Sequence, residues 1–369
     1  MSMVFVHQMH EQRVIFDAGG AVERIAGEAT RLGAGAVGLI ASERDRELGE
    51  ALTAELPIAL RWTEVRPHVP VDVASRATNA IRASGVDTLV CVGGGSTIGL
   101  AKIVALTAGL PIIAVPTTLS GSEGTPVWGL TENGAKQIGV DEKVLPTTVV
   151  YDSDLLRSLP AGLFAASGLN ALAHAVDALW APNANPINRL FALEAVEALS
   201  EALPKIVAGG DRTALDQALY GCYLGAVAFA SAGAGLHHKI CHVLGGTFGL
   251  PHAQTHATVL PHVVALNAAA VPVVAAQLAD ALGKGNSLPG EHEAPEKRAL
   301  AALLKLNVSL GLSSPLADLG LTADDLPDAA RRIVAAAPDS NPVTVTHANI
   351  TALLRDALSG SAPAGTEQR

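Results

Sequence analysis

The chain has 369 residues, of which 49% are hydrophobic and 16% charged, a globular composition with room for two domains. A net charge of −10 without basic runs argues against a nucleic-acid partner, and the lack of a long uninterrupted apolar run argues against a membrane partner. The start does not resemble a secretory signal, and three widely spaced cysteines (Cys91, Cys222 and Cys241) predict reduced thiols, so we expect a cytoplasmic protein.

The first part of the chain alternates short apolar runs with helical patterns. Helices are predicted at about 43–56 and at 71–85. Strands are predicted at 36–42, 59–65, 87–96, 111–118 and 146–152. Apolar strands separated by helices are typical of a parallel sheet covered on both faces, so this part is predicted to be a Rossmann-like α/β domain.

After about residue 155 the pattern becomes helical. Helices are predicted at 164–180, 188–207, 214–232 and 272–282. We therefore predict an α/β dinucleotide-binding domain over 1–155 and an all-helical substrate domain over 156–369. Residues 284–299 are expected to form a polar loop, and residues 360–369 a disordered tail.

A glycine-rich turn follows the strand predicted at 87–96. Gly93, Gly94 and Gly95 would let the backbone approach an anion, and the N–H groups of the following helix would face it. The turn lacks both the GxGxxG spacing and a Walker lysine, so a phosphate loop and a simple tight turn both stay open.

A second polar turn follows the strand predicted at 111–118. Its hydroxyl side chains are Thr117, Thr118, Ser120 and Ser122. Alone it would be an ordinary turn, but ligands of open α/β sheets bind at the carboxyl ends of strands. Two such turns in one half of the chain favour a dinucleotide site.

Histidines concentrate in residues 235–262. Of the twelve in the chain, six lie here: His237, His238, His242, His252, His256 and His262. His238 and His242 are four apart, which puts them on one face of a helix, and Asn170 and His174 share this spacing elsewhere.

His252 follows His238 by fourteen residues, about 21 Å along an unbroken helix. We expect a break at Gly245, Gly246, Gly249 and Pro251 that lets the histidines converge. The alternative for any single histidine is a core side chain bonded to the backbone.

The two turns carry a family resemblance. GGGSTIGLAK (93–102) followed by VPTTLSGSE (115–123) resembles the iron-containing alcohol dehydrogenases, although Gly99 stands where that family usually has Asp. The resemblance implies an N-terminal nucleotide-binding domain and a helical C-terminal domain. It also implies coenzyme binding by Gly94, Gly95, Ser96, Thr117 and Thr118.

The choice of coenzyme is left open by the strand at 36–42. It ends at Ser42, which we expect to contact the coenzyme. Glu43 would favour NADH, whereas Arg44 and Arg46 could hold the 2′-phosphate of NADPH. We expect NADH, NADPH or both.

The resemblance also maps a metal site onto the histidines. Metal-using members hold the ion at positions that correspond to Asn170, His174, His238 and His252, with Asp at the first. Asn170 removes the anionic ligand, which weakens binding of a hard ion. GLHHKICHVLGG, LPHAQTH and SGLNALAH resemble a branch of the family, the maleylacetate reductases, which generally require no metal.

The branch resemblance implies NAD(P)H-dependent reduction of a dicarboxylate enoate to 3-oxoadipate. We predict that His174, His238, His242 and His252 bind the substrate and that one of them, His242 or His238, donates a proton. Four further side chains are expected to hold the substrate carboxylates: Asn170, Ser122, Lys239 and Lys136.

Two alternatives stay open. One is a metal-dependent alcohol or glycerol dehydrogenase of the same fold, and the other is a nucleotide-binding homologue without activity. Family resemblance suggests a homodimer.

Overall fold

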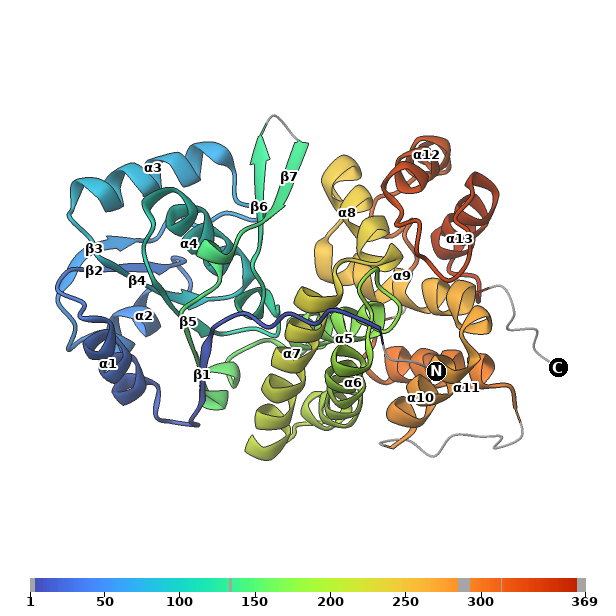
Figure 1. The fold of residues 1–369 in the computed structure, drawn as a ribbon, viewed down its shortest axis with the longest axis horizontal. Coiled ribbons are helices and arrows are strands. Elements are labelled where there is room, and N and C mark those ends of the chain that lie inside the picture. The colour runs from blue at the N-terminus through green and yellow to red at the C-terminus, as the bar shows by residue number, and fades with distance from the viewer. Residues whose placement is uncertain (1–3, 133–134, 285–292, 313, 364–369) are drawn as a thin grey trace. The chain divides into compact units, whose positions relative to one another are not determined.

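The computed structural model describes residues 4–132, 135–284, 293–312 and 314–363. The chain forms two compact units (Figure 1). One contains Met9–Leu159, and the other contains Pro160–Arg369 together with Met1–Gln8. The two units therefore divide at Leu159, four residues after the position predicted from the sequence.

The α/β unit is built on a parallel sheet of six strands in the order β1-β8-β5-β4-β2-β3. The strands are β1 (Arg13–Phe16), β2 (Val37–Ala41), β3 (Ile58–Trp62), β4 (Thr88–Gly93), β5 (Ile112–Pro116) and β8 (Thr148–Tyr151). β2, β4, β5 and β8 are buried along their whole length. That burial is why these strands are continuously apolar instead of alternating.

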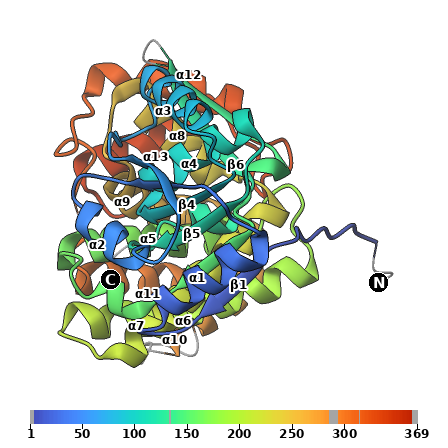
Figure 2. The same cartoon turned by 90° about the vertical axis from the view of Figure 1, so that its left-hand side faces the viewer.

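Four helices cover the sheet: α1 (Ala21–Leu32), α2 (Arg46–Leu52), α3 (Val71–Ala83) and α4 (Gly95–Ala108). α1 and α2 contact each other and pack on β2, β4, β5 and β8, whereas α3 and α4 pack together. Figure 2 shows α1 and α3 on different sides of β4 and β5. Ile25, Leu39, Val90 and Ile113 belong to the core between α1, α2 and the sheet. The predicted α/β class is confirmed.

Three strands were not predicted. β1 lies at the edge of the sheet, and β6 (Val127–Glu132) pairs with β7 (Ala135–Val140) in an antiparallel hairpin. The hairpin carries mixed polar residues and β1 has only four residues, so neither produces a strong apolar pattern.

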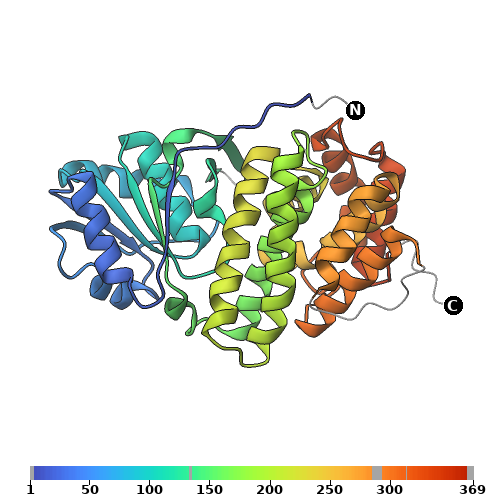
Figure 3. The ribbon, with the colours of Figure 1, turned by 60° about the horizontal axis from the view of Figure 1, so that its bottom comes forward.

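The helical unit is centred on α5 (Ala161–Ala178), which contacts α6 (Pro186–Val207), α7 (Arg212–Ala232), α8 (Leu236–Phe248) and α9 (His252–Asn267). Figure 3 shows α6 and α7 side by side. The remaining helices are α10 (Pro272–Gly283), α11 (Pro295–Ser309), α12 (Leu326–Ala336) and α13 (His347–Ser359). α8, α9, α12 and α13 share a core that includes Leu236, Ile240, Val259 and Ile333.

The predicted helix break after His242 is confirmed at Gly249 and Pro251 but not at Gly245 and Gly246. Gly245 and Gly246 lie inside α8, which ends at Gly249 with a left-handed φ of 73°. Pro251 then precedes α9. Two glycines within a helix are tolerated where tertiary packing supports it, whereas a left-handed cap followed by proline ends it.

Two other predicted segments are only partly described. Of the loop predicted at 284–299, residues 295–299 belong to α11, where Pro295 occupies the favourable first turn. Residues 285–292 lie outside the described part, as do 364–369 of the predicted tail.

Within the described residues, no single helix has both the length and the apolar character needed to cross a membrane. α7 and α8 reach that length and composition only as a pair, and the two are bent by 98° at the break between them.

Candidate functional site

The glycine turn joins β4 to α4. Gly93 has a φ of 152°, which favours glycine, and Gly94 precedes the first turn of α4 without any side chain capping that turn. The N–H groups at a helix start carry partial positive charge and have no partner within the helix. The turn therefore presents, at the carboxyl edge of the sheet, a helix end of the kind that can bind an anion.

The second polar turn lies directly against the first. Gly93 pairs with Pro116 in the sheet, and the N–H of Thr117 donates to the carbonyl of Gly93 at 3.1 Å. A Cβ atom placed on Gly94 would lie 2.9 Å from Cγ2 of Thr118, and one on Gly95 would lie 3.1 Å from Cβ of Ser120. Glycine allows this close approach, since a Cβ atom at either position would make Thr118 or Ser120 shift, and together the turns form one polar edge.

Lys102 ties α4 to the second turn. Its side chain is fully buried, and Nζ donates to the carbonyls of Ser122, Thr125 and Val127 at 2.5, 2.7 and 2.8 Å. Burial lowers the pKa of Lys102 to about 7. Glu123, buried beside it, accepts a hydrogen bond from Tyr151. Lys102 thus fixes the loop in which Ser122 lies.

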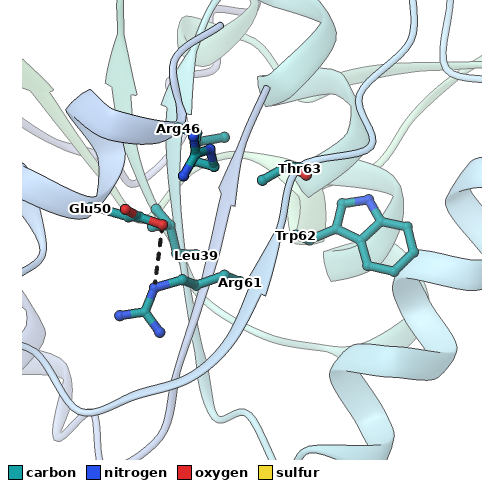
Figure 4. A pocket seen from close by; sticks show the side chains of 7 residues that line it. Leu39, Arg46, Glu50, Arg61, Trp62 and Thr63 are labelled. Atoms are coloured by element: carbon teal, nitrogen blue, oxygen red, sulfur yellow. Dashed lines mark ion pairs between the residues drawn. The ribbon is translucent and has the colours of Figure 1, made fainter. Parts of the chain in front are cut away.

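A small pocket lies between β2, α2 and β3 (Figure 4). Its polar lining includes Arg46, Glu50, Arg61 and Thr63. Arg46 pairs with Glu43 at 3.1 Å, and Arg61 lies 3.9 Å from Glu50. Nearby, the Ser42 hydroxyl donates to Asp45 at 2.7 Å. Both arginines already face carboxylates, so this edge of the sheet carries charge of both signs.

Helix α5 presents a polar face in an otherwise apolar environment. Every residue from Phe164 to Ala178 is buried. Asn170, His174 and Asp177 are spaced four and three residues apart, so they lie on one face of the helix. Burying polar groups is costly without partners, which indicates that this face has a specific role.

Asp177 holds the start of α8. Its carboxylate accepts hydrogen bonds from the backbone N–H groups of Gly235, His237 and His238 at 2.9–3.3 Å, and from Nδ1 of His238 at 2.8 Å. It therefore caps α8 from another helix. A Cβ on Gly235 would lie 2.4 Å from the carboxylate, so glycine is needed there.

This contact sets the tautomer of His238. With Nδ1 donating to Asp177, Nε2 of His238 carries a lone pair. Nε2 is buried and has no partner among the described residues. Burial raises the pKa of Asp177 to about 7, while the three backbone donors oppose that rise.

Six imidazoles meet between α5, α8 and α9. The rings of His174 and His238 are nearly parallel, with their centres 4.9 Å apart. Phe229 of α7 packs against both rings. His256 lies 4.9 Å from His238 and 4.4 Å from His252, while His242 lies 6.0 Å from His238. The sixth is His237, whose Nε2 is 2.9 Å from Nδ1 of His256.

The cluster is mostly uncharged. Burial lowers the pKa of His174 to about 4 and of His237 to about 3, and it places those of His238 and His256 well below the usual value. Mutual repulsion between the rings adds to the effect on the last three. His242 and His252 differ in being only half-buried. They are the histidines of the cluster that are partly exposed.

The predicted site residues fall into two sets. Asn170, His174, His238, His242 and His252 lie in the helical unit with half-buried Lys239 on α8. The α/β unit contains Gly94, Gly95, Ser96, Thr117, Thr118, Ser42, Ser122 and Lys136. Lys136 belongs to β7, but its side chain lies outside the described part.

Three residues were not assigned a role from the sequence: Asp177, His237 and His256. Two could have been found from spacing, because Asp177 follows His174 by three residues and His256 follows His252 by four. Nothing in the sequence indicates that His237 and His256 meet.

The family resemblance implies a metal at Asn170, His174, His238 and His252, and these residues do not fit one as placed. The amide of Asn170 supplies no negative charge, and Asp177 on the same face is engaged by the start of α8. In the described part of the chain, the ligand atoms of His174, His238 and His252 do not gather within 4.8 Å. A hard divalent ion prefers anionic oxygen ligands, which this set lacks.

Known proteins match both units. Residues 11–153 match the family model described as iron-containing alcohol dehydrogenase, and 164–358 match that of the C-terminal part of the Fe-containing alcohol dehydrogenase family. The maleylacetate reductase of Sphingobium indicum is 43% identical over 364 residues, covering 98% of this chain and 99% of its own.

Solved structures give the same grouping. An iron-containing alcohol dehydrogenase from Corynebacterium glutamicum is 48% identical with a TM-score of 0.93, covering 99% of both chains. The maleylacetate reductase of Rhizobium sp. is 39% identical with a TM-score of 0.89, covering 98% of this chain and 100% of its own.

Proposed function

The chain belongs to the iron-containing alcohol dehydrogenase family, and from this premise we propose that it uses NADH or NADPH to reduce the carbon–carbon double bond of maleylacetate to 3-oxoadipate. Similarity to maleylacetate reductases over nearly the whole chain supports the reaction. The structural observation that carries the proposal is Asn170 on the polar face of α5. It replaces a metal-binding carboxylate but leaves the imidazoles in place.

The coenzyme would bind at the paired turns of the α/β unit. Gly94, Gly95 and Ser96 would hold its pyrophosphate at the start of α4, and Thr117 and Thr118 would contact it from the second turn. Ser42 would lie on the adenosine side. Arg46 is paired with Glu43, which leaves charge of both signs at that edge, so we expect NADH and NADPH both to be accepted.

The reaction can proceed without a metal. When bound, the coenzyme would supply a hydride to the alkene carbon farther from the ketone, so that negative charge develops on the ketone oxygen. Hydrogen-bond donors can stabilise that charge in a buried site. A proton delivered to the carbon next to the ketone completes the product.

We assign the proton delivery to His242. In the tautomer set by Asp177, His238 has a lone pair at Nε2 and no proton to give there. His174 and His238 are both buried, and burial lowers their pKa values. His242 is half-buried and lies one helical turn from His238, so it combines access with proximity. His174, His238 and His252 would then orient the substrate.

The substrate carries a carboxylate at each end and needs positive or hydrogen-bonding partners. Lys239 and Asn170 of the helical unit would supply such partners. The roles of Ser122 and Lys136 stay predictions from the sequence. A homodimer and a cytoplasmic location remain predictions. All three cysteines are buried and none is in a disulfide, which supports a reducing compartment.

The test is to follow oxidation of NADH and NADPH with freshly prepared maleylacetate, with and without prior dialysis against a strong chelator. Equal rates with and without dialysis would support reduction that needs no metal. Loss of this activity that Fe²⁺ or Zn²⁺ restores would mean that Asn170 does not exclude a metal and that the histidines are its ligands. Metal-dependent oxidation of simple alcohols without turnover of maleylacetate would favour an alcohol or glycerol dehydrogenase. Coenzyme binding without turnover of maleylacetate or an alcohol would favour an inactive homologue.

A further inference from the structure

A second group of potential metal ligands lies beside the candidate catalytic histidines. Among the described residues, the one group of three or more His, Cys, Asp or Glu whose ligand atoms all lie within 4.8 Å of one another is His237, Cys241 and His256. All three side chains are buried. His237 and Cys241 are four apart on α8, and His256 approaches them from α9.

Two of the three distances between these atoms are close to those of a zinc site, and all three are within 4.8 Å. Nε2 of His237 lies 2.9 Å from Nδ1 of His256 and 3.7 Å from Sγ of Cys241. With Zn–N of about 2.0–2.1 Å and Zn–S of about 2.3 Å, tetrahedral ligand atoms lie about 3.3–3.6 Å apart. The two imidazoles would have to separate by only a few tenths of an ångström.

The chemistry of the donors also differs from that of the set at Asn170. Two imidazoles and a thiolate suit a borderline or soft ion such as Zn²⁺, whereas an amide with three imidazoles offers no anion. Binding would displace the thiol proton of Cys241 and the proton shared by His237 and His256. We propose that His237, Cys241 and His256 form a Zn²⁺-binding site, separate from the positions at which the family holds iron.

The surroundings set the expected strength of binding. Metal-bound imidazoles are usually held by a partner on their other nitrogen. Nδ1 of His237 and Nε2 of His256 are buried and have no such partner in the described part of the chain. Binding is therefore expected to be weaker than in a structural zinc site, and the titration must extend to excess metal.

The experiment uses the full chain, reduced and stripped of metal, titrated with Zn²⁺ against a chromophoric zinc chelator. Titration with Co²⁺ provides a second readout, because cobalt bound to a thiolate absorbs in the near ultraviolet. The variants are Cys241→Ser, His256→Ala and His174→Ala, with Cys91→Ser as the matched control, a buried cysteine of the other unit. Circular dichroism checks that each variant is folded, and Cys241→Ala replaces Cys241→Ser if the serine variant is not.

We expect one Zn²⁺ per chain and a Co²⁺–thiolate absorption. Losing a ligand should weaken binding at least about 100-fold in Cys241→Ser and His256→Ala, while His174→Ala and Cys91→Ser bind as the wild type does. The proposal is overturned by the absence of stoichiometric binding, by binding that survives Cys241→Ser, or by binding that is lost in His174→Ala but kept in Cys241→Ser.

Discussion

Asp177 of α5 accepts a hydrogen bond from Nδ1 of His238 at 2.8 Å while it also caps the helix that carries His238. One carboxylate therefore fixes both the position of α8 and the tautomer of His238.

The variant Asp177→Asn would turn an NH2 group toward N–H donors. We expect kcat to fall about 5–150-fold, the equivalent of about 1–3 kcal/mol for a buried hydrogen bond lost, with little change in the KM for NADH, measured by steady-state kinetics. Exposed Asp216 on α7 gives the matched control, Asp216→Asn, and equal kcat in the two variants would contradict the role.

The proton-donor assignment predicts a specific kinetic defect. His242→Ala should lower kcat by about 10²–10⁴, the range typical for loss of a general acid, and leave NADH affinity unchanged. NADH affinity is measured by fluorescence titration and kcat by stopped-flow or steady-state assays. Exposed His347 on α13 supplies the control, His347→Ala. Near-normal turnover of His242→Ala would move the role to another histidine.

The contact between the two turns predicts a coenzyme defect. In Gly94→Ala the added Cβ would lie 2.9 Å from Cγ2 of Thr118, so the Thr118 side chain or the turn that carries it must shift. We expect the KM for NADH to rise about tenfold or more, which corresponds to about 1.4 kcal/mol. Gly27 in α1 has nothing within 4 Å of its Cβ position, so Gly27→Ala should leave KM unchanged and stabilise the helix by about 0.5–1 kcal/mol. Similar KM values for both variants would contradict the proposed coenzyme site.

Lys102 predicts coupling between α4 and the second turn. In Lys102→Met the carbonyls of Ser122, Thr125 and Val127 lose their donor, at a cost of about 1–3 kcal/mol for each group left unsatisfied. We expect a lower thermal midpoint and a higher KM for NADH. Lys205→Met, at an exposed position of α6, is the control. A Lys102→Met variant as stable as the wild type would show that these contacts contribute little.

Buried His262 on α9 predicts acid sensitivity. Burial lowers its pKa from 6.5 to about 4, and Asp356 offsets part of that shift. Below about pH 6.5, His262 binds a proton in the unfolded chain but not in the folded chain. Its contribution to the free energy of unfolding is therefore full well above pH 6.5 and falls as the pH drops toward 4. Between pH 6.5 and 5 the loss is about 1.6 kcal/mol.

The measurement compares thermal midpoints of wild type and His262→Gln at pH 7 and pH 5. From pH 7 to pH 5, the thermal midpoint of His262→Gln should fall by less than that of the wild type. His347→Gln, at the exposed site, should behave like the wild type. An equal loss in all three proteins would mean that His262 does not contribute to the acid sensitivity.

The sequence by itself determined the elements whose pattern is local. Continuous apolar runs predict β2, β4, β5 and β8, because strands buried on both faces have no polar side. Four-residue spacing predicts that Asn170 and His174 share a face, and the glycines and hydroxyl side chains predict that two turns lie at one edge of the sheet. Gly245 and Gly246 were misassigned because helix packing outweighs the intrinsic cost of glycine.

Only the tertiary structure decided which side chains meet across helices. Asp177 and His238 are sixty-one residues apart, and His237 and His256 nineteen, and no local pattern specifies contacts over such separations. The exposure that distinguishes His242 and His252 from their buried neighbours depends on how α5, α8 and α9 pack. Helical periodicity fixes the face on which a side chain lies, whereas burial, tautomer and pKa are set by what packs against that face.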